Sequence, residues 1–343
     1  MKNLFNALAV LLIIAAPSRA ASLNVNQPAD DAIVFSANVA ISGTSTAASV
    51  KLQSAAMSAS IPVINHEWSF SDVPLLPGLN ALDLSDDAGG RLTLFITRGT
   101  GVTVRPPQKV RLVWEEGTDD ELREIARGTL ARQLDEPALA EFVRAVKALA
   151  SGVFRRAYAG VADVRLTDDD GDDVHTIRFL GLDEDAFGLT VTDCGNADLH
   201  GRSRVFVGTY RRLLVGHLDQ WAPMTENDSP EVRMQDIGEA LGRTAAHELG
   251  HGLGLVIDDP ASPCRWMNGC NISHSCSTFQ NLHPGIRRFA EGAFIMDAGD
   301  ETANHERLAE PGGEGRAERR APSTFCDFDR SYLRLIHPTG ATP

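Results

Sequence analysis

The spacing of the hydrophobic residues changes near residue 104, and this change limits the folds open to the chain. Before it, apolar residues alternate with small or polar ones, as Val50 and Leu52 do, which is typical of strands with one buried face. After a proline-containing segment at 104–110, apolar residues such as Leu122 and Ile125 recur at helical spacing. The chain is therefore expected to form two parts with different secondary structure.

The alternating pattern covers residues 22–103, where turn-forming segments such as 77–80 and 86–90 separate short apolar runs. Strands of this length and spacing predict a β-sandwich of about 80 residues. The order of its segments, from QPADDAIVFSANVAISGT to LTLFITR, resembles bacterial immunoglobulin-like modules attached to secreted enzymes. No group of His, Glu or Cys gathers there, which favours a spacer, a stabiliser or an adhesion module.

Residues 111–343 combine strand and helix signals, which indicates an α+β domain. Thr118 and Glu121 form a capping-box pattern, and the segment 135–137 contains a proline expected to divide two helices. Strands are expected at 161–166, 174–180 and 204–208. Ser229 followed by Pro230 has the composition of a helix start.

Length and charge limit the number of domains and the kinds of partner that the chain can have. The 343 residues fit about two domains. The chain has 46 acidic against 32 basic residues and a formal charge of −14, which argues against a nucleic-acid partner bound through its phosphates. No segment after the first twenty residues is apolar enough to predict a membrane span.

The first twenty residues have the pattern of a secretory signal. Lys2 precedes an apolar run at 4–17, and Ser18 and Ala20 are small residues suited to cleavage near Ala20. This pattern predicts a secreted protein, either extracellular or periplasmic. Export would allow the five cysteines to oxidise, and their odd number leaves at least one without a partner in the chain.

The segment HELGH at 247–251 contains the residues best suited to catalysis. His247 and His251 are four residues apart, so a helix places both imidazoles on one face, where they can bind one Zn²⁺. Zinc lowers the pKa of a bound water towards neutrality, and the carboxylate of Glu248 can act as the general base. The motif therefore predicts zinc-dependent hydrolysis, with a chance match on an unrelated helix as the alternative.

HELGHGLGL resembles the active-site helix of the metzincin zinc peptidases. The resemblance implies that Gly254 ends this helix and turns the chain towards a third zinc ligand. It also implies a methionine-containing turn beneath the metal, and the segment AFIMD at 293–297 matches it with Met296. The motifs cover roughly 230–300, and the layout from about 108 is compatible with the same fold.

The third ligand departs from the usual pattern. The expected position is Ile257, which cannot bind metal, and leishmanolysin-like metzincins carry an insertion at this point. The chain resembles them, and the candidates are His274, with His283 and then Asp258 as alternatives. Cysteines at 264, 270 and 276 surround the first candidate, and a disulfide among them could hold the insert.

Two smaller features each have two interpretations. The acidic segment 168–173 could bind Ca²⁺ through carboxylate oxygens, but it lacks the full spacing of an EF-hand loop, and a solvated hairpin turn is the alternative. Cys194 could occupy the open zinc position as an inhibitory thiol, or form a disulfide, for instance with Cys326. The second interpretation of Cys194 is the simpler one.

The residues together predict a secreted zinc endopeptidase whose partner is a protein or peptide substrate. By analogy with metzincins, the substrate would pair with the edge of the sheet, and the segment 205–207 is the expected edge strand. The alternatives are an adhesion or binding protein with a degraded metzincin-like domain, and a zinc hydrolase acting on a substrate other than a peptide.

Overall fold

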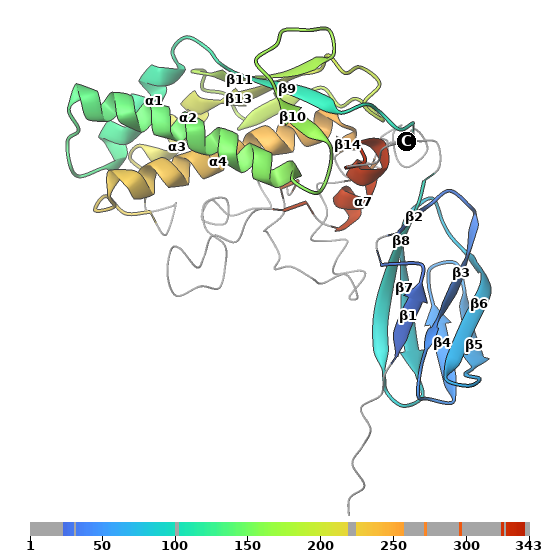
Figure 1. Cartoon of the computed structure of the whole chain (residues 1–343). Coiled ribbons are helices and arrows are strands. Elements are labelled where there is room, and N and C mark those ends of the chain that lie inside the picture. Colours follow the sequence, from blue (N-terminus) through green and yellow to red (C-terminus); the bar gives the residue numbers. More distant parts are fainter. Residues whose placement is uncertain are drawn as a thin grey trace, which may run out of the picture.

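The structure, a computed structural model, describes residues 23–30, 32–99, 103–218, 224–256, 271–272, 295–296, 324–325 and 327–339. The predicted signal at 1–20 lies outside these residues. The buried hydrophobic side chains form two separate clusters, one within residues 23–96 and the other within 110–336. Figure 1 shows the strands of the first cluster and the mixed strands and helices of the second.

Two sheets enclose the first cluster. Because side chains alternate along a strand, every second one faces inward. Val50 and Leu52 are fully buried, and Trp68 and Phe70 are almost fully buried. One sheet has the order β1-β3-β6 and the other β2-β8-β7-β4-β5. The strands are β1 (Asn24–Gln27), β2 (Ala32–Val34), β3 (Asn38–Thr44), β4 (Ser49–Gln53), β5 (Ser58–Pro62), β6 (Glu67–Pro74), β7 (Gly78–Asp86) and β8 (Arg91–Arg98).

The second cluster is built on a five-stranded sheet of order β10-β9-β11-β13-β12. Its first four strands pair in parallel, and β12 pairs antiparallel with β13. The bounds are β9 (Gln108–Trp114), β10 (Val164–Leu166), β11 (Val174–Leu180), β12 (Gly188–Thr190) and β13 (Arg202–Phe206). A pair of two-residue strands, β14 (Leu255–Val256) and β15 (Asn271–Ile272), forms a separate parallel sheet.

The position of β12 corrects the expectation that 205–207 forms the edge strand. Val205 belongs to β13, which lies between β11 and β12, and Val207 begins a helix. A strand with two neighbours has no free edge, and Val205 has no exposed surface. The edge is formed by β12, whose three residues are too few to show an alternating pattern in the sequence.

Local capping chemistry explains where the long helices begin. Asp135 accepts a hydrogen bond from Ala138 N at 3.0 Å, and Ser229 accepts one from Val232 N at 3.3 Å, each with a proline in the first turn. The helices are α1 (Thr118–Thr129), α2 (Glu136–Tyr158), α3 (Val207–Leu214), α4 (Pro230–Gly252) and α7 (Asp327–Ile336).

The predicted capping box at the start of α1 is wrong. The N-cap is Gly117, in the left-handed region, and no side chain caps this end. Thr118 instead lies inside the helix, where its buried hydroxyl donates to the carbonyl of Phe179 on β11 at 3.0 Å. A bond to the sheet has replaced the local bond that the sequence favours.

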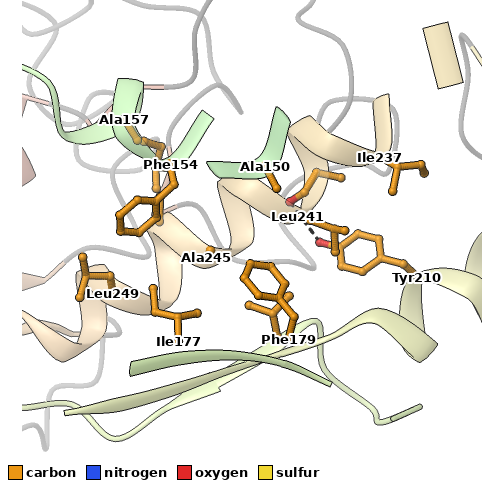
Figure 2. Packing of buried hydrophobic residues seen from close by; sticks show 14 of the residues in the cluster. Ala150, Phe154, Ala157, Ile177, Phe179, Tyr210, Ile237, Leu241, Ala245 and Leu249 are labelled. Atoms are coloured by element: carbon orange, nitrogen blue, oxygen red, sulfur yellow. Dashed lines mark hydrogen bonds between the residues drawn. The ribbon is translucent and has the colours of Figure 1, made fainter. Parts of the chain in front are cut away.

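Helix α4 is held in the centre of the second cluster. Figure 2 shows side chains of α2, α4 and β11 converging, with Leu241, Ala245 and Leu249 on α4. These three side chains have no exposed surface. Burial of a leucine side chain is worth roughly 1.5–3 kcal/mol, so this packing fixes both the position and the rotation of α4. Within the described residues, no helix is both long enough and apolar enough to cross a membrane.

Candidate metal centre

The C-terminal turn of α4 brings His247 and His251 together. Their Nε2 atoms are 3.1 Å apart, and the two rings are nearly perpendicular. His251 is only 8% exposed, because the residues around the C-terminal turns of α4 are buried. The structure thus shows the proximity that the four-residue spacing predicts, whereas their role as metal ligands stays a prediction.

Backbone carbonyls determine which nitrogen of each ring carries a proton. Nδ1 of His247 lies 2.8 Å from the carbonyl oxygen of Ile295, and Nδ1 of His251 lies 2.7 Å from that of Leu255. A carbonyl oxygen only accepts, so both Nδ1 atoms must donate. Burial lowers the pKa of His251, which favours its neutral form. In the neutral rings, the lone pairs of the two Nε2 atoms therefore face each other.

This arrangement fits a shared metal cation. Two lone pairs that face each other at 3.1 Å repel unless a cation lies between them. Tetrahedral zinc with Zn–N bonds of about 2.0–2.1 Å separates two ligand nitrogens by roughly 3.3 Å, close to the observed spacing. Hydrogen bonds from the remote ring nitrogens to carbonyls are also the usual support of histidine ligands.

Gly254 follows the end of α4, the helix that carries His247 and His251. Its φ of 102° lies in the left-handed region, and a Cβ there would be 2.4 Å from the Oη of Tyr332. Both the turn and the close approach require glycine. The chain leaves α4 in the direction that places the carbonyl of Leu255 against His251.

Met296 packs against α4 at Gly250, between the two histidines. It has no exposed surface, and a Cβ on Gly250 would be 2.5 Å from its sulfur atom. The preceding residue, Ile295, supplies the carbonyl that orients His247. The two described residues of the predicted methionine turn therefore touch the helix between the two histidines and orient one of them.

Glu248 is 5% exposed and points towards the edge of the sheet. Its Oε2 accepts a hydrogen bond of 2.7 Å from Thr190 on β12. The backbone of the same strand is close to the other oxygen, because a Cβ on Gly188 would be 2.3 Å from Oε1. The edge strand thus bonds one oxygen of the carboxylate and lies close to the other.

The candidates for the third ligand, His274, His283 and Asp258, lie outside the described residues. In the part of the chain that the structure describes, no group of three or more His, Cys, Asp or Glu side chains is arranged to hold a metal ion. The identity of the third ligand therefore stays a prediction.

The structure does not support the calcium interpretation of the acidic segment 168–173. Asp173 forms an ion pair of 2.7 Å with Lys109, and Asp170 one of 3.1 Å with Arg111. These exposed carboxylates are neutralised by basic side chains of β9 and do not form a common oxygen cage. Lys109 also lowers the pKa of Asp173, mainly through their hydrogen bond.

Cys194 is disulfide-bonded in the structure, and no cysteine among the described residues is free. A cysteine in a disulfide has no thiolate to offer a metal, so the structure does not favour an inhibitory thiol at this position. Its suggested partner, Cys326, lies outside the described residues.

Sequence reasoning missed the side chains next to Glu248. Thr190, Ser203 and His175 form a partly buried chain of hydrogen bonds behind the carboxylate. None has the spacing of a ligand or belongs to a motif. The only signal in the sequence is that polar residues occupy inward positions of short strands.

No family model matches the chain, and no curated protein matches it. Among solved structures, it is similar to high choriolytic enzyme 1, a hatching enzyme zinc-protease from the medaka fish Oryzias latipes. The identity is 11%, the match covers 66% of this chain and 88% of that chain, and the TM-score is 0.22.

Proposed function

We propose that the chain is a secreted zinc-dependent endopeptidase of the metzincin type. The observation that carries this proposal is the pair of Nε2 atoms, 3.1 Å apart, whose protonation is fixed by two backbone carbonyls. His247 and His251 would hold the metal together with a third ligand, His274 in the first instance and His283 as the alternative. When bound, zinc would polarise the scissile carbonyl and acidify the attacking water.

Glu248 would act as the general base. Its carboxylate takes a proton from the attacking water and returns it to the leaving amine. The hydrogen bond from Thr190 to Oε2 holds the carboxylate in one orientation. Low exposure keeps bulk water away from the group, which strengthens its interactions with a reacting molecule.

The edge strand β12 suits an extended peptide substrate. Among the described strands, β12 pairs only with β13, so its other side can accept main-chain hydrogen bonds from a peptide. Leu189 is 56% exposed and Val191, just beyond the strand, is 84% exposed. An exposed apolar edge is rare on a protein surface unless something pairs with it, which supports a peptide as the substrate.

The N-terminal sheets would serve as an immunoglobulin-like module over 22–103, joined by a linker to the peptidase domain. The linker expected at 104–110 would end at 107 instead of 110, because Gln108 begins β9 of the second sheet. The support is the separate hydrophobic cluster between two sheets. We assign this module the role of a spacer or adhesion unit. Separate production of 22–103 as a folded all-β protein would test the boundary.

The decisive experiment combines metal analysis with hydrolysis of casein. The wild type should contain one zinc per chain and cleave casein. Glu248→Ala should keep the zinc but lose roughly 10²–10⁴-fold in rate, whereas His251→Ala should lose the metal. Glu231→Ala removes an exposed carboxylate from the first turn of the same helix and serves as the control with normal activity.

Two results would overturn the proposal. A wild type without zinc would favour the adhesion or binding protein with a degraded site. Cleavage by Glu248→Ala at the wild-type rate would remove the general base from the reaction. If zinc is bound but no peptide in a library is cut, the hydrolase acts on another class of substrate.

A further inference from the structure

Three neighbouring strands place polar side chains behind Glu248. Thr190 on β12 and Ser203 on β13 are direct partners in the antiparallel register, and His175 lies on β11, on the other side of β13. Ser203 and His175 are buried, with 0% and 1% exposure. Buried polar groups on adjacent strands are costly unless they bond to one another, and these do.

The hydrogen bonds between them form a continuous chain. Thr190 Oγ1 lies 2.7 Å from Glu248 Oε2 and 2.8 Å from Ser203 Oγ, which in turn lies 2.7 Å from His175 Nε2. A hydroxyl has one proton, and the carboxylate can only accept. Thr190 therefore donates to Glu248, Ser203 donates to Thr190, and Nε2–H of His175 donates to Ser203.

The state of His175 fits this direction. Burial lowers the pKa of His175 to about 4, so the ring is neutral near pH 7 and carries a single proton. With that proton on Nε2, the ring can only donate to Ser203 at this nitrogen. The hydrogen-bond chain thus has one arrangement of protons, and this arrangement ends on Oε2 of Glu248.

The edge strand also restricts the second carboxylate oxygen. A Cβ on Gly188 would be 2.3 Å from Oε1, so any side chain at this position would displace Glu248. Oε2 is held by a hydroxyl and Oε1 faces a bare backbone, both on β12. A carboxylate that is bonded at one oxygen and confined by backbone at the other has less freedom to rotate, and a fixed orientation favours proton transfer.

We infer that Thr190 and Ser203, backed by His175, are positioning residues that hold the Glu248 carboxylate ready for proton transfer. The inference rests on the proposed function, because it assigns these residues to the same reaction. In this role their side chains act through Glu248. Their contribution should therefore appear in kcat, with little change in KM or in zinc affinity.

The test compares Thr190→Val with Thr190→Ser. Valine keeps the shape of threonine but lacks the hydroxyl, and serine restores it. We expect Thr190→Val to lower kcat roughly 10- to 100-fold, with unchanged zinc affinity measured by chelator competition, and Thr190→Ser to recover most of the rate. Ser203→Ala should give a smaller loss in kcat, because the bond from Thr190 to Glu248 remains.

Thr93→Val is the matched control. The hydroxyl of Thr93 also donates to a carboxylate, that of Asp83, at 2.7 Å, but on the N-terminal sheet. It should leave kcat unchanged.

Wild-type kcat in Thr190→Val, or loss of zinc in both Thr190 variants, would overturn the inference. If Thr190→Val does not fold, Ser203→Ala decides the question: unchanged kcat in a folded Ser203→Ala contradicts the chain of bonds. Failure of the proposed function looks different, because the wild type would then lack zinc or Glu248→Ala would cleave casein at the wild-type rate.

Discussion

His337 should make the second core sensitive to acid. Its side chain is 1% exposed and joins two segments: Nδ1 donates to the carbonyl of Pro106 at 2.8 Å, and Nε2 lies 2.9 Å from the amide nitrogen of Asn196. The amide donates, so Nε2 must be the unprotonated nitrogen. A second proton on the ring would point at another donor, which explains why protonation is unfavourable here.

The magnitude follows from the pKa. Burial lowers the pKa of His337 to about 4 from the usual 6.5. Between these two pH values the unfolded chain binds a proton at this histidine and the folded protein does not. The free energy of unfolding therefore has its full value above about pH 6.5 and decreases as the pH drops towards 4. Lowering the pH to 5 crosses about 1.5 pH units of this range, at about 1.36 kcal/mol each, and costs roughly 2 kcal/mol of unfolding free energy.

The assay is urea unfolding at pH 7 and at pH 5, followed by circular dichroism at a helix band. All described helices belong to the second core, so this signal reports its unfolding alone. His337→Gln keeps one donor and one acceptor but does not titrate. The variant should therefore lose about 2 kcal/mol less than the wild type between the two pH values.

His217→Gln is the control, because His217 is an exposed histidine and its replacement should leave the pH dependence unchanged. If His337→Gln and the wild type lose the same stability between pH 7 and pH 5, the assignment of a neutral His337 is refuted.

Two further predictions concern the metal centre. Gly250→Ala would place a Cβ 2.5 Å from the sulfur of Met296 and should destabilise the second core by roughly 1–3 kcal/mol and weaken zinc binding. Gly152→Ala on α2 meets only Arg156, at 3.4 Å, and should instead stabilise by about 0.5–1 kcal/mol; equal effects in urea unfolding would contradict the steric argument. If free zinc is present at 100 times its Kd, removing the zinc with a chelator should lower the unfolding free energy by about 2.7 kcal/mol. If the chelator lowers the unfolding free energy of His251→Ala by the same amount, the stabilising zinc is not bound at this site.

The elements that the sequence predicts well are those with strong local signals. Helix α4 combines a serine cap, a proline in the first turn and regular apolar spacing, and it forms as expected. The proximity of His247 and His251 follows from helix geometry alone. These features need no knowledge of the rest of the fold.

The features that sequence reasoning misses depend on contacts between distant segments. Thr190 and Glu248 are 58 positions apart, and their bond requires β12 to lie at the sheet edge. The position of β12 was missed because three residues show no periodicity. Thr118 shows the converse, since a contact with β11 overrides a local capping pattern.

The contact of α7 with the end of α4 has a consequence for the order of assembly. Tyr332 donates to the carbonyl of Leu253 at 3.1 Å and accepts from Gly195 N at 3.2 Å. Leu253 directly follows the histidine helix, yet the group that holds it is 79 positions further along the chain. During synthesis, the turn beyond the histidines therefore has only its local hydrogen bonds until Tyr332 has been added. Because contacts between distant segments form late, the candidate metal centre should be among the last parts to become rigid.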